Sequence, residues 1–332
     1  MEDLIFNAVL TAITICILII TLLWFMPHLI ITIFVRVAVI FSKFKEKNVC
    51  VKGNTYCSYI ERGNIDSTKK SILFIHGFFG SAVDFVQIAP YFDKSYHLVA
   101  IDMYNHGGTT SLNRNVTMED MVVLVKTFSE KTDLHRRKFH LVGFSMGGSV
   151  AVDYASQYSE DVASLTLMGT TGMQVNYMSG KKPKSVVFTS DEDLLNTLDY
   201  LSSGKLSHPP KAITTALRYY KNRKASDVDY VLNGTVYDYK FSEANLKSIS
   251  HLDVLILWGD EDLICPKQGM DFLKSRLPRA TDVLIKNCGH VMLLSHIKEV
   301  AEHLKRWMDS RENDDEKTVP HKSSNVVLKS PY

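Results

Sequence analysis

One serine of this chain lies in a pattern that can turn a hydroxyl into a nucleophile. The segment Gly143-Phe144-Ser145-Met146-Gly147 has the form Gly-x-Ser-x-Gly. It follows a short apolar run, Phe139 to Val142, that predicts a buried strand, and helix-like sequence comes after it. A strand, this turn and a helix are typical of a nucleophile elbow, which presents one serine hydroxyl above a sheet. The glycines are needed because bulkier neighbours would collide in so tight a turn.

A serine hydroxyl also needs a base to take its proton and an acid to orient that base. Where a serine occupies such an elbow, the acid and then the histidine follow it along the chain. Here Asp262 comes just after the predicted strand 254–258, and His290 comes just after the predicted strand 281–286. We favour Asp262 as the acid, although Asp260 and Glu261 are available on the same loop. The expected catalytic group is therefore Ser145, Asp262 and His290.

Acyl transfer further requires two backbone donors for the developing oxyanion. We expect one to be the amide of Met146, directly after the nucleophile, and the other the amide of Phe78, in the loop after the predicted strand 71–75. Both side chains are apolar and are expected to line an acyl pocket. His76, at the end of that strand, is interpreted as a structural hydrogen-bonding residue. The sequence contains no metal-ligand cluster, phosphate loop or dinucleotide fingerprint, so we expect neither metal nor cofactor.

These residues fall within alternating strands and helices. Six predicted strands alternate with helices, and a hairpin, Val49 to Ile60, precedes them. This order predicts an α/β fold with a mainly parallel eight-stranded sheet covered by helices on both faces. Ligands bind at the carboxyl ends of such strands, where His76, Asp102 and Ser145 lie. The alternation of strands and helices stops over residues 172–250, which predict a helical cap over these strand ends.

The N-terminus predicts a membrane anchor. Leu4 to Met26 contains no charged residue and is long enough to cross a bilayer. Glu2 and Asp3 precede it and basic residues follow it, which places the rest of the chain in the cytosol by the positive-inside rule. Leu29 to Phe41 is a candidate interfacial helix. Two sequons, at Asn115 and Asn233, would permit glycosylation only if the domain were lumenal.

Composition narrows the possible partners and sets the domain limits. The 332 residues carry a net charge of +2, which argues against nucleic acid as a partner. Five scattered cysteines suggest reduced thiols rather than a disulfide framework. The predicted organisation is an anchor and juxtamembrane segment over 1–48, one domain over 49–309, and a disordered polar tail over 310–332.

Over roughly Val49 to Met308 the chain resembles the α/β-hydrolase superfamily. The motifs that carry the resemblance are HGFFGS at His76, DMYNHGGTT at Asp102, GFSMGG at Gly143, WGDED at Trp258 and NCGH at Asn287. Together with the single N-terminal anchor they resemble the membrane-bound monoacylglycerol lipases of α/β-hydrolase-domain subfamily six. One departure is Asn105, where the common family pattern has glycine.

The resemblance implies hydrolysis of monoacylglycerols, including 2-arachidonoylglycerol, and of some lysophospholipids. It also implies that the enzyme acts at the cytosolic face of an internal membrane, which would be that of the endosome, the lysosome or the endoplasmic reticulum. It also supports the assignment of Ser145, Asp262 and His290 as the triad and of Phe78 and Met146 as the oxyanion donors.

Two function classes follow. The first is a membrane-anchored serine hydrolase acting on lipid esters, with amidase, lysophospholipase or acyl-thioesterase activity as alternatives because one triad supports any acyl transfer. A serine nucleophile argues against the epoxide hydrolase and dehalogenase chemistry of the same fold, which would use a carboxylate. The second is a catalytically silent membrane adaptor that uses the cap or the tail to bind partners.

Overall fold

A computed structural model of the chain describes residues 1–111, 115–173, 186–232 and 239–318. One eight-stranded sheet lies at its centre, with the strand order β1-β2-β4-β3-β5-β6-β7-β8. β2 pairs antiparallel with β1 and with β4, and the other neighbours are parallel. The predicted mainly parallel sheet, with a hairpin at its edge, is confirmed. The strands are β1 (Lys45–Lys52), β2 (Thr55–Arg62), β3 (Ser71–Ile75), β4 (His97–Ile101), β5 (Phe139–Phe144), β6 (Val162–Met168), β7 (Val254–Gly259) and β8 (Ala280–Ile285).

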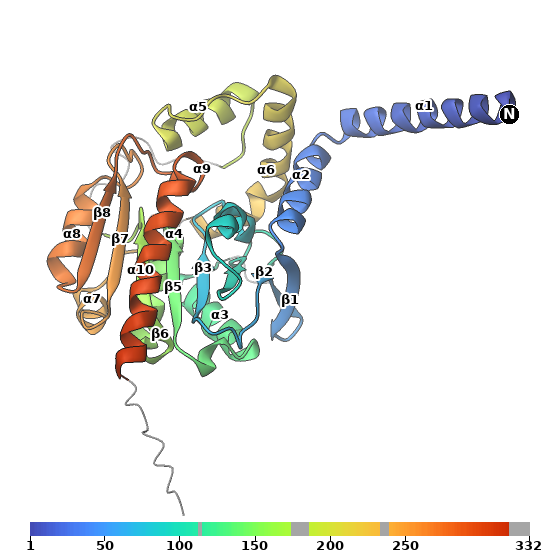
Figure 1. The fold of residues 1–332 in the computed structure, drawn as a ribbon. Coiled ribbons are helices and arrows are strands. Elements are labelled where there is room, and N and C mark those ends of the chain that lie inside the picture. The colour runs from blue at the N-terminus through green and yellow to red at the C-terminus, as the bar shows by residue number, and fades with distance from the viewer. Residues whose placement is uncertain (112–114, 174–185, 233–238, 319–332) are drawn as a thin grey trace, which may run out of the picture.

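Helices cover both faces of this sheet (Figure 1). The α-helices are α1 (Glu2–Phe25), α2 (His28–Phe41), α3 (Met118–Lys131), α4 (Met146–Gln157), α5 (Asp191–Ser202), α6 (Lys211–Leu232), α7 (Glu243–Ser248), α8 (Gln268–Arg276), α9 (Met292–Ser295) and α10 (Ile297–Thr318). The described part of the chain also forms the 3₁₀ helices η1 (Ala82–Tyr91), η2 (Leu134–Arg136) and η3 (Ser159–Asp161). Every residue of β3, β4, β5 and β7 is buried, as expected for parallel strands packed on both sides.

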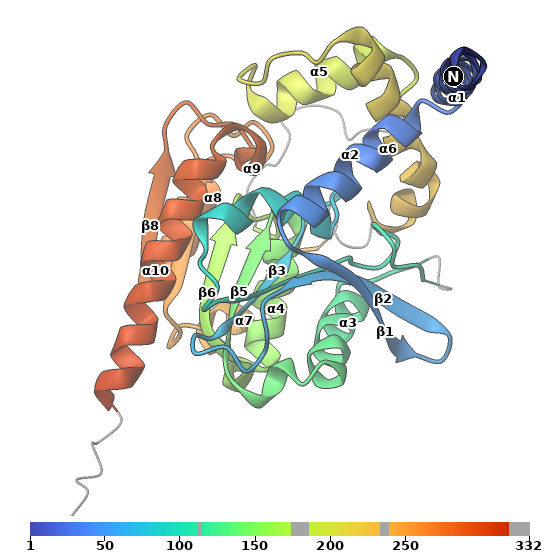
Figure 2. The same cartoon turned by 45° about the vertical axis from the view of Figure 1, so that its right-hand side comes forward.

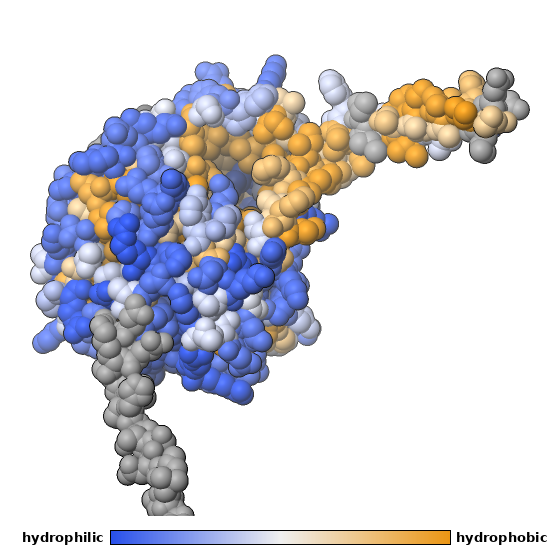
Figure 3. Space-filling model, in the orientation of Figure 1, coloured by the Kyte–Doolittle hydropathy of each residue, from blue (hydrophilic) through white to orange (hydrophobic). Residues whose placement is uncertain are grey.

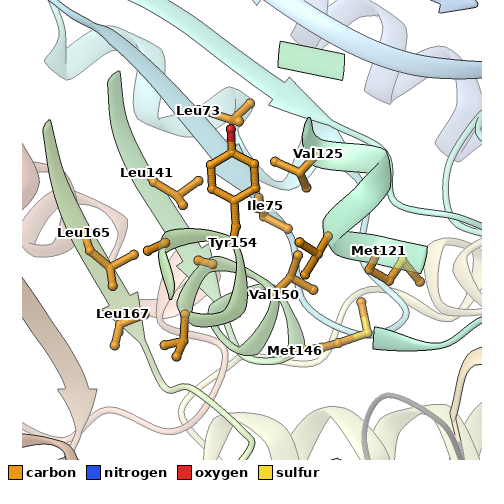
Figure 4. Packing of buried hydrophobic residues seen from close by; sticks show 14 of the residues in the cluster. Leu73, Ile75, Met121, Val125, Leu141, Met146, Val150, Tyr154, Leu165 and Leu167 are labelled. Carbon is orange, nitrogen blue, oxygen red and sulfur yellow. The ribbon is translucent and has the colours of Figure 1, made fainter. Parts of the chain in front are cut away.

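Two hydrophobic clusters hold the layers together. One joins the sheet to α3, α4, α7 and α8, and the other joins it to α2, η1, α9 and α10. In Figure 4 the Tyr154 ring of α4 lies among apolar side chains of the strands and of α3, including Leu73, Leu141 and Val125. Its hydroxyl donates to Asp161 over 2.5 Å. A Thr117–Asp120 capping box starts α3, with the Asp120 amide 3.2 Å from the Thr117 hydroxyl.

Two helices stand above the carboxyl ends of the strands. Figures 1 and 2 show α5 and α6 there, over the end of the sheet at which Ser145 follows β5. α7 lies elsewhere, because it packs against α4 and its Asn245 donates to Asp153 of α4 over 2.6 Å. The part of the predicted cap that covers the strand ends is therefore α5 and α6. Residues 174–185 and 233–238 of the predicted cap lie outside the described residues.

The C-terminal helix extends further than the sequence predicted. We expected a disordered tail from residue 310, but α10 continues to Thr318. Glu312 accepts a hydrogen bond from the Lys70 amide over 3.1 Å and lies 3.1 Å from Nε2 of the buried His140. These partners at the amino ends of β3 and β5 anchor a stretch that looks unpatterned in sequence. Residues 319–332 of the predicted tail lie outside the described residues.

The N-terminal segment exposes a continuous apolar surface. Residues Ile5–Phe25 of α1 form a helix that is long and apolar enough to cross a bilayer. In α2, Val39 is buried against the domain, while Phe34, Ile40 and Phe41 face outward. Figure 3 shows hydrophobic side chains running from α1 along α2 towards a recess beneath α5. One face of α2 therefore packs on the domain, and its other face exposes apolar side chains.

Candidate active site

The strained turn after β5 fixes the position of Ser145. Its backbone has φ 53° and ψ −119°, in a region that non-glycine residues rarely adopt. A Cβ on Gly143 would lie 2.4 Å from the carbonyl oxygen of Gly147, and one on Gly148 would lie 2.2 Å from the Thr170 hydroxyl. Side chains at these two positions would push α4 away from β5 and β6. The glycines therefore let α4 start directly at the nucleophile candidate.

Three side chains that are far apart in the sequence meet at this turn. The Ser145 Oγ lies 2.9 Å from Nε2 of His290, and Nδ1 of His290 lies 2.8 Å from Oδ2 of Asp262. All three residues are buried, with 5–7% of their surface exposed. This geometry allows His290 to accept the serine proton at Nε2 while Asp262 holds the proton at Nδ1.

Asp262, rather than Asp260, faces the histidine. Oδ1 of Asp262 accepts hydrogen bonds from the amides of Ile264 and Cys265, each over 2.8 Å. These two amides orient the carboxylate and leave Oδ2 for His290. Asp260 instead accepts from the Cys288 amide over 3.3 Å and pairs with Lys286 over 3.5 Å. Glu261, the third carboxylate of this loop, pairs with Lys205 over 3.0 Å. Of the three carboxylates left open by the sequence, the structure therefore brings Asp262 to His290.

The cap contacts the loop that carries His290. The Leu201 carbonyl at the end of α5 accepts from the His290 amide over 2.8 Å and from the Val291 amide over 3.2 Å. A Cβ on Gly289 would lie 2.5 Å from the backbone of Ser202, which explains the glycine before the histidine. On the acid loop, the Tyr200 hydroxyl donates to the carbonyl oxygen of residue 263 over 3.1 Å. The end of α5 therefore positions both loops.

The loop after β3 lies directly against Ser145. A Cβ on Gly77 would lie 3.0 Å from the Cβ of Ser145. The Gly77 carbonyl accepts from Nδ1 of His76 over 2.7 Å and from the Gly80 amide over 3.0 Å. Because a trans peptide is planar, fixing this carbonyl also fixes the Phe78 N–H, which points the opposite way. Within the described residues, the Phe78 amide donates to no protein acceptor.

Two buried histidines support this loop in their neutral forms. Nε2 of His76 accepts from the Met103 amide over 3.0 Å, and Nε2 of His106 accepts from the Phe79 amide over 3.1 Å. Burial lowers the pKa of His76 to about 4 and the pKa of His106 to about 3. Both rings therefore stay neutral near pH 7, with the proton on Nδ1 and an acceptor at Nε2. His76 thus has the hydrogen-bonding role expected of it.

The Met146 side chain does not line an open acyl pocket. It is fully buried in the core, and Figure 4 shows it beside Met121 of α3. The expectation for this side chain was wrong, because the first turn of α4 directs it toward α3 rather than toward the strand ends. The backbone amide of Met146 still follows Ser145 at the start of α4. Phe78, by contrast, is partly exposed.

Side-chain hydrogen bonds from Asp102 and Asn105 hold the loop after β4 in place. Asp102 accepts from the amides of Ala82 and Gly108, each over 2.7 Å, and so ties η1 to this loop. Asn105, where glycine is common in the family, adopts φ 63°. Its side chain accepts from the Ser111 amide over 2.9 Å, and asparagine tolerates this left-handed conformation better than most residues. The departure at Asn105 therefore keeps the turn.

Three potential metal ligands lie within 4.8 Å of one another: Asp262, Cys265 and His290. Two of them already form the hydrogen bond described above. Burial raises the pKa of the Cys265 thiol well above its usual value, which disfavours the thiolate that a metal would need. The donor set therefore fits the Asp–His pair better than a metal ion.

Sequence reasoning did not assign two of these supporting groups. His106 sits in a strand-end loop, as His76 does, and this placement is the signal that could have marked it. The Leu201 carbonyl had no signal, because a backbone acceptor leaves no trace in residue type.

The sequence and fold of this domain match known proteins. Residues 70–297 match the family model described as the alpha/beta hydrolase fold. The chain belongs to this family. Lipase 3 of Moraxella sp. is 25% identical over 81% of this chain and 86% of its own length. Monoacylglycerol lipase ABHD6 of Homo sapiens is 26% identical over 74% of this chain and 77% of its own length.

A solved structure is also similar to this chain. It is a membrane phospholipase A described as a bacterial virulence factor, and it superposes with a TM-score of 0.77. It shares 25% identity and covers 94% of this chain and all of its own. Family membership and the lipase relatives identify the protein as a carboxylic ester hydrolase with lipase or esterase activity.

Proposed function

We propose that this protein hydrolyses monoacylglycerols at a membrane surface through an acyl-enzyme on Ser145. The observation that carries the proposal is the continuous hydrogen-bonded path from Ser145 through His290 to Asp262. The substrate class is supported by the relatives named monoacylglycerol lipase and by the apolar surface of α1 and α2. A single ester group on an amphiphile can reach a site of this kind from a lipid surface.

Acylation uses the triad and the two amides. His290 takes the Ser145 proton at Nε2 as Oγ attacks the ester carbonyl, and the carbonyl oxygen becomes an oxyanion. The amides of Phe78 and Met146 donate to that oxyanion. His290 then gives its proton to the glycerol oxygen, the ester C–O bond breaks, and glycerol leaves.

Deacylation repeats these steps with water. His290 removes a proton from water, and the resulting hydroxyl attacks the acyl carbon of the Ser145 ester. The same two amides stabilise the second oxyanion. The proton returns from His290 to Ser145 Oγ, and the fatty acid leaves. Asp262 remains ionised throughout and stabilises the imidazolium of His290.

The membrane part of the proposal rests on α1 and α2. A helix of the length and apolarity of α1 can hold the domain at a bilayer. The exposed apolar face of α2, which includes Phe34 and Phe41, would then lie in the membrane interface. This placement brings the recess beneath α5 close to the lipid that holds the substrate (Figure 3).

Full-length protein in detergent micelles is expected to prefer monoacylglycerol. In a panel with lysophosphatidylcholine and an acyl-coenzyme A thioester of the same chain length, kcat/KM for monoacylglycerol should be at least about tenfold higher, a difference of about 1.4 kcal/mol. Ser145→Ala serves as the blank. A higher kcat/KM for lysophosphatidylcholine or for the thioester would assign the enzyme to lysophospholipases or thioesterases instead. Absence of turnover on all three would favour the membrane adaptor.

We further propose that the protein is anchored in an internal membrane and that its catalytic domain faces the cytosol. Asn115 is exposed, so its sequon is open to a lumenal glycosyltransferase if the orientation is reversed. We expect the protein from eukaryotic cells to show no mobility shift after treatment with an N-glycosidase. A shift that Asn115→Gln abolishes would place the domain in the lumen.

A further inference from the structure

Lys221 of the cap contacts the loop after β3, which carries Phe78 and Phe79. Lys221 of α6 donates from Nζ to the carbonyl oxygen of Phe79 over 2.9 Å, and its ammonium lies 5.1 Å from the centre of the Phe79 ring. Lys221 is half-buried. Its helix, α6, packs against α2 and α5. Lys221 and Phe79 are 142 residues apart in the sequence.

The bond ends on a peptide group that is itself part of a hydrogen-bonded series. The Phe79 carbonyl shares its peptide plane with the Gly80 N–H, which donates to the Gly77 carbonyl over 3.0 Å. The Gly77 carbonyl in turn shares its plane with the Phe78 N–H. Two planar trans peptides therefore connect the ammonium of Lys221 to the proposed oxyanion donor.

Such a series strengthens its last donor. Each carbonyl that accepts a hydrogen bond polarises the N–H of the same peptide, and a cation at the head of the chain adds to the effect in a buried site. The loop also needs support, since Phe79 adopts φ 61°, a left-handed conformation that is unfavourable for a bulky residue. The contacts from Lys221 and from Nε2 of His106 hold Phe79 in that conformation.

We propose that Lys221 is a positioning residue for ester hydrolysis: from the cap it holds and polarises the peptides that present the Phe78 amide to the oxyanion. This inference rests on the proposed role of Phe78. It has a mechanistic consequence, because the oxyanion donor is complete only when α6 is seated on the domain. Lys221 then couples the position of the cap to stabilisation of the transition state.

The test compares Lys221→Met, Lys221→Arg and Lys211→Met in the full-length detergent-solubilised protein. Lys211 is exposed at the start of the same helix, so its substitution controls for the loss of one positive charge. The substrate is p-nitrophenyl butyrate, which any serine esterase of this fold can hydrolyse. Inactive wild-type protein would therefore refute the proposed function itself rather than the role of Lys221.

Lys221→Met is expected to lower kcat by about 10- to 100-fold with KM within about threefold, since removal of a direct oxyanion donor costs about 10²- to 10³-fold and this effect is indirect. Lys221→Arg should restore most of kcat, and Lys211→Met should resemble the wild type. An inhibitor that forms a hemiketal with Ser145, such as a trifluoromethyl ketone, should lose affinity in proportion to kcat/KM.

Unchanged kcat in Lys221→Met overturns the proposal, as does a rise in KM alone, because the lysine would then act in substrate binding. Failure of Lys221→Arg to restore kcat also overturns it. If Lys221→Met does not fold, Lys221→Gln takes its place, since it lacks the charge and is too short to reach Phe79 in the same way. Wild-type kcat in Lys221→Gln would then overturn the proposal.

Discussion

Asp262→Asn is expected to lower kcat for ester hydrolysis by about 10⁴-fold, the size of effect seen when a triad aspartate is replaced by asparagine. The reason lies in the two amides that bind Oδ1 of Asp262. In the variant they would retain the amide oxygen, so the NH₂ group would face Nδ1 of His290. The imidazole would then carry its proton at Nε2 and could not accept the proton of Ser145.

Asp260→Asn is the matched control, because it makes the same change two residues away on the same loop. Asp260 pairs with the exposed Lys286, an interaction worth about 0–1 kcal/mol, so kcat should change by about fivefold at most. Both variants are measured with p-nitrophenyl butyrate near pH 7. A large loss in Asp260→Asn together with a small one in Asp262→Asn would transfer the role of the acid to Asp260.

Ser145→Ala is expected to lower kcat by about 10⁴- to 10⁶-fold, since removal of the nucleophile leaves only the oxyanion donors and binding. The substitution removes one oxygen atom from a buried site, and alanine has no group that can form the acyl-enzyme. Activity is measured on monoacylglycerol with the released fatty acid quantified, so that a slow residual rate can be detected.

Ser149→Ala is the control for this variant. Ser149 lies one turn further along α4, is fully buried and shares a hydrogen bond of 2.7 Å with Thr171. Its loss should cost about 1 kcal/mol of stability and leave the chemistry intact. Retention of more than about 1% of wild-type kcat in Ser145→Ala would contradict the proposed acyl-enzyme, because the loss would be far below that expected for a missing nucleophile.

The sequence was sufficient to predict the strands around the site and the loops that carry its three candidate residues. Buried parallel strands are continuous apolar runs, and the loops at their carboxyl ends carry Ser145, Asp262 and His290 in the order that the fold requires. Once the sheet is predicted, these loops must meet at one edge. The choice between Asp262 and Asp260 could not be made in this way, since it depends on which carboxylate the loop amides orient toward His290.

Other features depend on contacts that residue types do not reveal. The direction of the Met146 side chain follows from how α4 packs on α3, and the support of His290 comes from a backbone carbonyl of α5. α10 continues beyond residue 310 because Glu312 finds Lys70 and His140, more than 170 positions earlier in the chain. Local sequence predicts a polar tail there, whereas tertiary contacts stabilise a helix.

The most direct test of the account is the identity of the residue that a fluorophosphonate modifies in the native protein. We expect mass spectrometry of digested wild-type protein to place one adduct on Ser145, and we expect His290→Ala to remain unmodified after the same exposure. An adduct on a different serine, or equal labelling of Ser145→Ala, would contradict the proposal that His290 and Asp262 activate this hydroxyl.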